Sequence, residues 1–151
     1  MMKINWVRMI VSGLMAAAIC FISDGFLHEK LLSQDWLAVY HQLGGSLPKA
    51  EHGGHMVYFA FFELGRGLVS LFVYVLMRER YGPGPKTAAL AGLVAWIAFS
   101  VTGPAQFIPL GFFSNALWAK TMGFQLITSI LAAIAGAAIY KDSLSFAPRE
   151  S

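Results

Sequence analysis

Four long apolar segments separated by short polar stretches dominate the chain. They occupy about residues 4–27, 56–77, 87–108 and 117–140. A helix of about 20 apolar residues crosses the hydrocarbon core of a bilayer, and each segment reaches that length. The pattern therefore predicts an all-α, polytopic membrane protein whose four transmembrane helices form a bundle.

The connection between the first two segments, residues 28–55, carries a further apolar pattern. On a helix, one face would present Leu32, Trp36, Val39, Tyr40 and Leu43, and the pair Gly44-Gly45 would end it. We expect this helix to lie along the membrane surface, within the first outer loop.

The third segment carries a proline near its end. Its apolar run, Thr87 to Thr102, spans only about 24 Å at 1.5 Å per residue. We therefore expect the helix to continue through Gly103-Pro104 to about Ile108, with a kink. Pro104 lacks a backbone N–H, so the Ser100 carbonyl would lose its helical partner.

The amino-acid composition is also typical of a membrane protein. The 151 residues are 57% hydrophobic and 13% charged, whereas soluble domains carry about 25% charged residues. Four spans use most of the length, so residues 1–151 are interpreted as a single integral membrane domain. The first segment begins like a secretory signal peptide. Its apolar run continues through Ile22 and further spans follow, which favours an uncleaved first span.

The basic residues indicate an orientation. The formal net charge is +3, but most Lys and Arg residues flank apolar segments, so they predict topology rather than nucleic-acid binding. The positive-inside rule places both termini in the cytoplasm and the long loop outside. Lys3, Arg8, Arg78, Arg80, Lys86, Lys141 and Arg149 are on the expected cytoplasmic side, against Lys30, Lys49 and Lys120 on the other.

Small residues recur four apart in the last two segments. The pairs are Ala88/Gly92, Ala91/Ala95, Ala132/Gly136 and Ala133/Ala137. Such stripes allow helices to approach closely. Packing within the bundle and an interface with a second copy or another membrane protein are both compatible with them.

One turn of the chain resembles a known group. The run Arg80-Tyr81-Gly82-Pro83-Gly84-Pro85-Lys86-Thr87-Ala88, followed by Ala91-Gly92-Leu93 and Trp96, is similar to the turn between spans two and three in a group of small uncharacterised bacterial four-helix membrane proteins. The resemblance implies a bacterial inner-membrane protein. It implies no activity and no functional residues.

Besides Arg8 and Lys120, which are counted above with the flanking basic residues, three charged residues lie inside the predicted spans. Each costs about 3 kcal/mol or more there without a partner. Glu63 and Arg66 are three apart on one helix face, and Asp24 lies near the outer end of the first span. Gln125, with Thr102 and Gln106, can join the same layer. This polar cluster is either a structural salt bridge or a proton or solute site that opens outward.

The outer loop is rich in histidine. His28-Glu29 directly follows the first span, and Glu51-His52-Gly53-Gly54-His55 directly precedes the second. His28, Glu29, His52 and His55 are a possible set of ligands for a transition metal. A pH-sensitive loop and ordinary solvated surface are the alternatives.

Enzyme signatures are missing from the sequence. It contains no G-x-S-x-G, no P-loop and no HExxH motif, and no histidine lies at the centre of a span to hold a haem. The simplest prediction is a non-enzymatic structural or accessory component of the inner membrane. The alternatives are a small transporter or channel with an outward-facing polar site, and a metal-binding membrane protein.

Overall fold

The computed structural model describes residues 4–42, 54–112 and 114–140, and every regular element in these ranges is helical. The elements are α1 (Trp6–Phe26), the π-helical turn η1 (Leu27–Leu31), α2 (Ser33–Gln42), α3 (Gly54–Tyr81), α4 (Pro85–Trp96), the π-helical turn η2 (Ile97–Val101), α5 (Thr102–Ala105) and α6 (Asn115–Ile139). The predicted all-α class is confirmed.

Four helical segments are long and apolar enough to cross a membrane. They are Trp6–Leu31, Met56–Tyr81, Pro85–Ala105 and Asn115–Ile139. Their outer surfaces carry large apolar side chains, such as Ile22, Ile127 and Leu131, that are more than half exposed. Apolar faces of this extent are expected to contact lipid tails. The chain is a multi-pass membrane protein.

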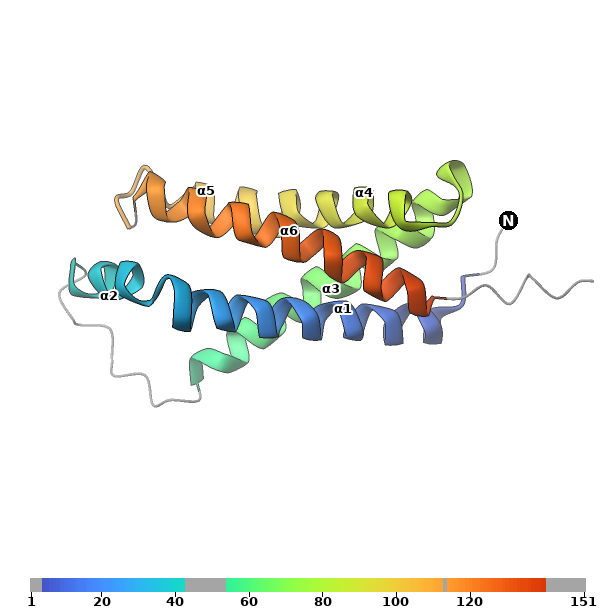
Figure 1. Ribbon diagram of the computed structural model, residues 1–151, viewed down its shortest axis with the longest axis horizontal. Coiled ribbons are helices and arrows are strands. Elements are labelled where there is room, and N and C mark those ends of the chain that lie inside the picture. The colour runs from blue at the N-terminus through green and yellow to red at the C-terminus, as the bar shows by residue number, and fades with distance from the viewer. Residues whose placement is uncertain (1–3, 43–53, 113, 141–151) are drawn as a thin grey trace, which may run out of the picture.

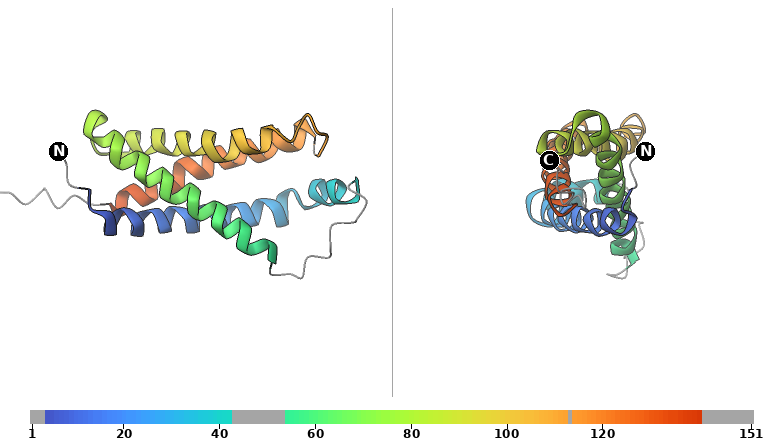
Figure 2. Two further views of the ribbon diagram at one scale, coloured as in Figure 1. Left: turned by 180° about the vertical axis from the view of Figure 1, so that it is seen from behind. Right: turned by 90° about the vertical axis from the view of Figure 1, so that its right-hand side faces the viewer.

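The four long segments form a ring of neighbours. Helix α1 packs against α3 and α6, and α4 packs against the same two helices. Figure 2 shows that α3 crosses the bundle obliquely, so that its first turns lie away from α4 and its last turns lie beside it. The end of the bundle where α3 begins is therefore the less tightly closed one.

Close helix contacts depend on glycine. A Cβ atom added at Gly67 of α3 would lie 2.4 Å from the Ala17 nitrogen and 2.5 Å from the Gly13 oxygen of α1. A Cβ at Gly92 of α4 would lie 2.7 Å from the Ser129 oxygen of α6. These positions let the helix backbones pack directly against one another.

The small-residue stripes predicted in the last two segments are used inside the bundle. Ala88, Ala91, Ala95 and Ala133 are fully buried within the single chain, and Ala132 is almost so. Of the two interpretations, packing within the bundle describes these residues. An oligomer is a prediction that these contacts do not test.

The loop helix exists as α2, at the end of the bundle where α3 begins (Figure 1). Trp36 and Val39 pack against buried Leu27, Leu32 and Leu117. Asp35 also pairs with Lys120 of α6, with 2.8 Å between Oδ2 and Nζ. These contacts hold α2 against the start of α6. Gly44 and Gly45 lie outside the described residues.

The first span runs on through η1 to Leu31, past the predicted Leu27, and two other helix ends also differ clearly from the prediction. The third span stops at Ala105 instead of about Ile108, because Pro109 cannot donate a backbone hydrogen bond and Gly111 adopts φ +73°. Turn hydrogen bonds cover residues 104–111 instead, including Gly111 N–H to the Ile108 carbonyl at 3.0 Å. Helix α3 runs on to Tyr81, past the predicted Met77. Its last turns carry Arg78, which is buried with its Cζ 5.0 Å from the centre of the Tyr140 ring.

Candidate functional site

A layer of buried polar side chains joins α1 to α3. Arg66 Nη2 lies 2.8 Å from Glu63 Oε2 and 3.3 Å from Asp24 Oδ1, and Arg66 Nη1 lies 3.3 Å from Asp24 Oδ2. Glu63 and Arg66 meet because they are one helical turn apart on α3. Arg66 is 1% exposed, so its charge depends on these carboxylates rather than on solvent.

The other two spans complete this polar layer. The Gln125 side chain of α6 donates a hydrogen bond to Asp24 Oδ2, and the Ser100 hydroxyl of η2 accepts one from Arg66 Nη1 at 3.3 Å. All four predicted members, Asp24, Glu63, Arg66 and Gln125, are thus brought together. Ser100 was not expected among them. Thr102 stays outside, because its exposed hydroxyl donates to the Ala98 carbonyl of its own helix.

Both π-helical turns border the polar layer. Turn η1 begins three residues after Asp24, with the Leu32 N–H donating to the Leu27 carbonyl at 2.9 Å. Turn η2 contains Ser100. A π-turn inserts one residue into the helical repeat and rotates the side chains that follow. Near η2, Pro104 is the one residue whose type predicts an irregular helix. No comparable residue precedes η1.

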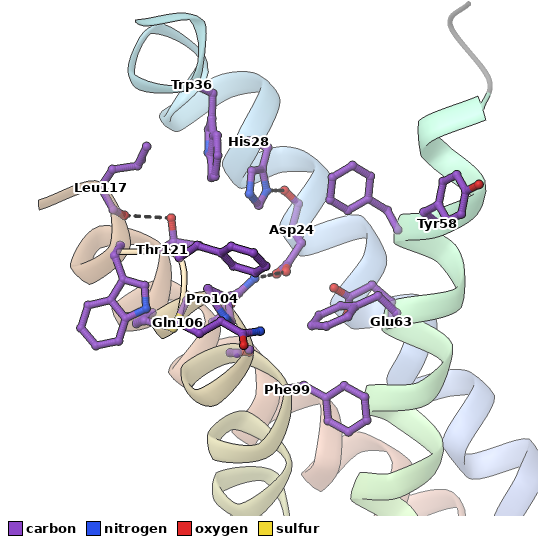
Figure 3. Close-up of a pocket in the computed structure, with 18 residues that line it drawn as sticks. Asp24, His28, Trp36, Tyr58, Glu63, Phe99, Pro104, Gln106, Leu117 and Thr121 are labelled. Atoms are coloured by element: carbon purple, nitrogen blue, oxygen red, sulfur yellow. Dashed lines mark hydrogen bonds between the residues drawn. The ribbon is translucent and has the colours of Figure 1, made fainter. Parts of the chain in front are cut away.

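A cavity of about 630 Å³ lies directly over the polar layer. Asp24, Glu63, Ser100 and Gln125 contribute to its floor, and Figure 3 shows Asp24, Glu63 and Gln106 pointing into the same space. Its walls are mostly aromatic: Tyr58, Phe59, Phe62, Phe99, Phe107 and Trp118. The polar layer is therefore not sealed by packed side chains on this side.

His28 stands at the rim of the cavity, above Asp24. Its Nδ1 lies 2.7 Å from the Asp24 backbone oxygen, which can only accept, so Nδ1 carries the hydrogen. The ring centre is 5.3 Å from that of Trp36 and 6.2 Å from that of Phe59. The imidazole is thereby held between α2 and α3.

A second hollow, of about 370 Å³, lies between α1 and α3. Asp24, His28, Phe59 and Glu63 line both hollows. The two carboxyl groups therefore border open space on two sides of the α1–α3 contact.

Two of the four proposed metal ligands have side chains that lie outside the described structure. His28 lines both hollows and Glu29 is exposed. His52 lies outside the described residues, as does the side chain of His55. Within the described part of the chain, no three His, Cys, Asp or Glu residues are grouped to hold a metal. The metal site stays a prediction, which elemental analysis of the purified protein beside a His28/His52/His55→Ala variant tests.

No protein family model, curated protein or solved structure matches this chain. What the site offers chemically is a buried guanidinium between two carboxyl groups, beneath an aromatic chamber large enough for a small molecule. Pockets that hold small ligands commonly measure about 300–1,000 Å³ and combine apolar walls with a few convergent polar groups.

Proposed function

We propose that this protein is a small transporter that binds a solute within the membrane, in the chamber above Asp24 and Glu63. The observation that carries the proposal is the cavity of about 630 Å³ with the polar layer at its floor. A salt bridge serving only to fix helix register needs no such space beside it, because interiors normally pack to high density. Charged groups that line a cavity within a span are typical of solute and proton pathways.

We further propose that the cavity faces the outside of a bacterial inner membrane, with both termini in the cytoplasm. The distribution of basic residues supports this orientation. Arg78 and Arg80 in the last turn of α3 and Lys86 at the start of α4 lie at the end of the bundle opposite the cavity. Positive residues are concentrated on the cytoplasmic side of membrane proteins.

A pair of adjacent cysteine substitutions tests whether the chamber admits solutes from outside. Met122 lines the cavity, and Gly123, the next residue of α6, is exposed on the outer surface of the bundle with nothing within 4 Å of an added Cβ. Both substitutions are made in a Cys20→Ala background, since Cys20 is the chain's one cysteine. Intact cells are treated with a membrane-impermeant methanethiosulfonate reagent.

We expect Met122→Cys to react and Gly123→Cys to stay unlabelled, although the two positions are only about 1.5 Å apart along the helix axis. A thiol facing lipid is neither hydrated nor ionised, so it reacts poorly. If both positions stay unlabelled in cells but react in detergent, the chamber does not open outward and the polar layer is structural.

A further inference from the structure

This inference rests on the proposed function and concerns the chemical class of the solute. The polar layer is unequal in charge: the carboxyl groups of Asp24 and Glu63 face a single guanidinium, that of Arg66. All three residues are at most 7% exposed. A net charge in a membrane interior is costly, so a second positive charge has to neutralise the extra carboxylate.

The two carboxyl groups are not equivalent. Asp24 Oδ2 accepts hydrogen bonds from Arg66 Nη1 and from the Gln125 amide, and Asp24 Oδ1 lies 3.3 Å from Arg66 Nη2, an arrangement that suits an ionised carboxylate. Among the described residues, Glu63 has one ion-pair contact, 2.8 Å from its Oε2 to Arg66 Nη2, and Asp24 Oδ1 approaches the same nitrogen. Glu63 is therefore the group whose charge is left to be matched by a proton or by a ligand.

Other groups around Glu63 do not supply the second positive charge. Helix α1 contributes the Cys20 thiol, which is buried beside Arg66. Turn η1 contributes His28, whose Nδ1–H donates to the Asp24 carbonyl at the rim; among the described residues the ion pair of Glu63 is with Arg66 and not with this ring. Helix α3 contributes Tyr58 at the cavity mouth. Turn η2 contributes Ser100, the residue after α5 is Gln106, and α6 contributes Thr121 and Gln125; none of these polar cavity residues is charged.

The cavity walls indicate what kind of cation fits. Phe59 and Phe62 of α3, Phe99 of η2 and Trp118 of α6 surround the space over Glu63. Phe62 and Phe99 stand edge to face, 5.6 Å between ring centres. Aromatic faces attract a cation that sheds water, and apolar walls favour a cation with hydrocarbon substituents over a hydrated metal ion.

We propose that the chamber binds a hydrophobic organic cation in exchange for a proton held by Glu63. In the empty chamber the Glu63 carboxyl carries the proton, and the layer is neutral. When the cation enters, the Glu63 O–H bond breaks, the proton leaves to solvent, and the carboxylate pairs with the cation. Charge is conserved, since one positive charge replaces another.

Two ions of the same shape and opposite charge test whether the chamber prefers a positively charged ligand. Purified protein in detergent is titrated by calorimetry with tetraphenylphosphonium and with tetraphenylborate, each corrected against protein-free micelles. We expect saturable binding of the phosphonium ion and none of the borate. Repeating the titration in buffers of different ionisation enthalpy is expected to reveal release of about one proton per cation bound. By linkage, affinity then rises about tenfold per pH unit while Glu63 is protonated in the empty site.

The decisive variants are Glu63→Gln and Glu63→Asp. The amide cannot release a proton or pair with a cation, so we expect Glu63→Gln to remain folded, to bind at least tenfold more weakly, and to release no proton. Glu63→Asp retains a carboxyl group, so we expect it still to exchange its proton for the cation. Glu79→Gln at the other end of α3 serves as the control and is expected to behave as wild type. Proton release unchanged in Glu63→Gln, or saturable borate binding, would overturn the proposal.

The same cysteine positions separate failure of this inference from failure of the proposed function. Met122→Cys is treated with methanethiosulfonates carrying either a trimethylammonium or a sulfonate group. Each rate is normalised to that of Gln42→Cys on exposed α2. A normalised preference for the cationic reagent supports the inference. Equal rates mean that the chamber is open but not selective for cations, and no labelling by either means that it is closed.

Discussion

At the scale of single residues, Arg66 is the largest fully buried side chain in the described structure. It is a fully buried cation whose contacts come from three helical segments: Asp24 of α1, Glu63 of its own helix and Ser100 of η2. Buried ion groups of this kind add little net stability as a set, but removal of one member leaves the others uncompensated.

We therefore predict that Arg66→Met destabilises the folded bundle by about 3–5 kcal/mol. Thermal or denaturant unfolding of the purified protein in mild detergent measures the loss. Arg66→Lys keeps the charge but not the planar fork, so a smaller loss is expected.

A fully neutral variant separates charge from packing. Asp24→Asn/Glu63→Gln/Arg66→Met removes every ionised group of the polar layer, and we expect it to regain most of the stability lost by Arg66→Met alone. If the neutral variant is as unstable as the single one, the shape of the side chains rather than uncompensated charge causes the loss.

At the scale of elements, direct backbone packing between helices decides the shape of the bundle. Gly67 fits against the backbone of α1 so closely that any side chain would collide with Ala17 and Gly13. Backbone atoms cannot rotate away as side chains do, so the helices themselves would have to separate.

We predict that Gly67→Ala lowers stability by about 1–3 kcal/mol, as overpacking does in other cores. Gly123→Ala is the matched control, since it places the same methyl group on a helix surface with nothing within 4 Å. It is expected to be neutral or slightly stabilising. Unfolding of both variants in the same detergent provides the comparison.

The position of α2 depends on apolar contacts more than on its ion pair. Leu117 is 3% exposed beneath Trp36 and Leu32, whereas the side chains of Lys120 and Asp35 are 54% and 41% exposed. Exposed ion pairs contribute about 0–1 kcal/mol. We predict that Leu117→Ala costs about 2 kcal/mol or more and Asp35→Asn less than about 1, as measured by unfolding. The reverse order would mean that the ion pair positions α2.

At the scale of the whole molecule, the two ends of the bundle differ in charge and in closure. The cavity and α2 occupy one end, and the basic residues of α3 and α4 occupy the other. This asymmetry suits a protein that receives a solute from one side of the membrane.

Orientation can be measured directly with two exposed positions. In a Cys20→Ala background, we predict that an impermeant thiol reagent labels Gln42→Cys of α2 in intact cells. Tyr81→Cys lies at the last residue of α3 and replaces a side chain that is 61% exposed. It is expected to react only after the membrane is permeabilised. The opposite labelling pattern would mean that the cavity faces the cytoplasm.

Local sequence determined much of this protein. The four spans follow from runs of apolar residues, because a helix in lipid satisfies its own backbone hydrogen bonds and needs only sufficient length. The pairing of Glu63 with Arg66 follows from their spacing of three residues on one helix. The α2 helix follows from its apolar face.

Only the tertiary structure decided how the helices are rotated about their axes. Rotation determines that Asp24 and Gln125 face Arg66, that Thr102 does not join them, and that Ser100 does. It depends on packing between segments far apart in the chain, such as Gly67 against Ala17, and on π-turns that shift the helical repeat. The cavity has the same origin, since it is the space left where obliquely crossing helices do not meet.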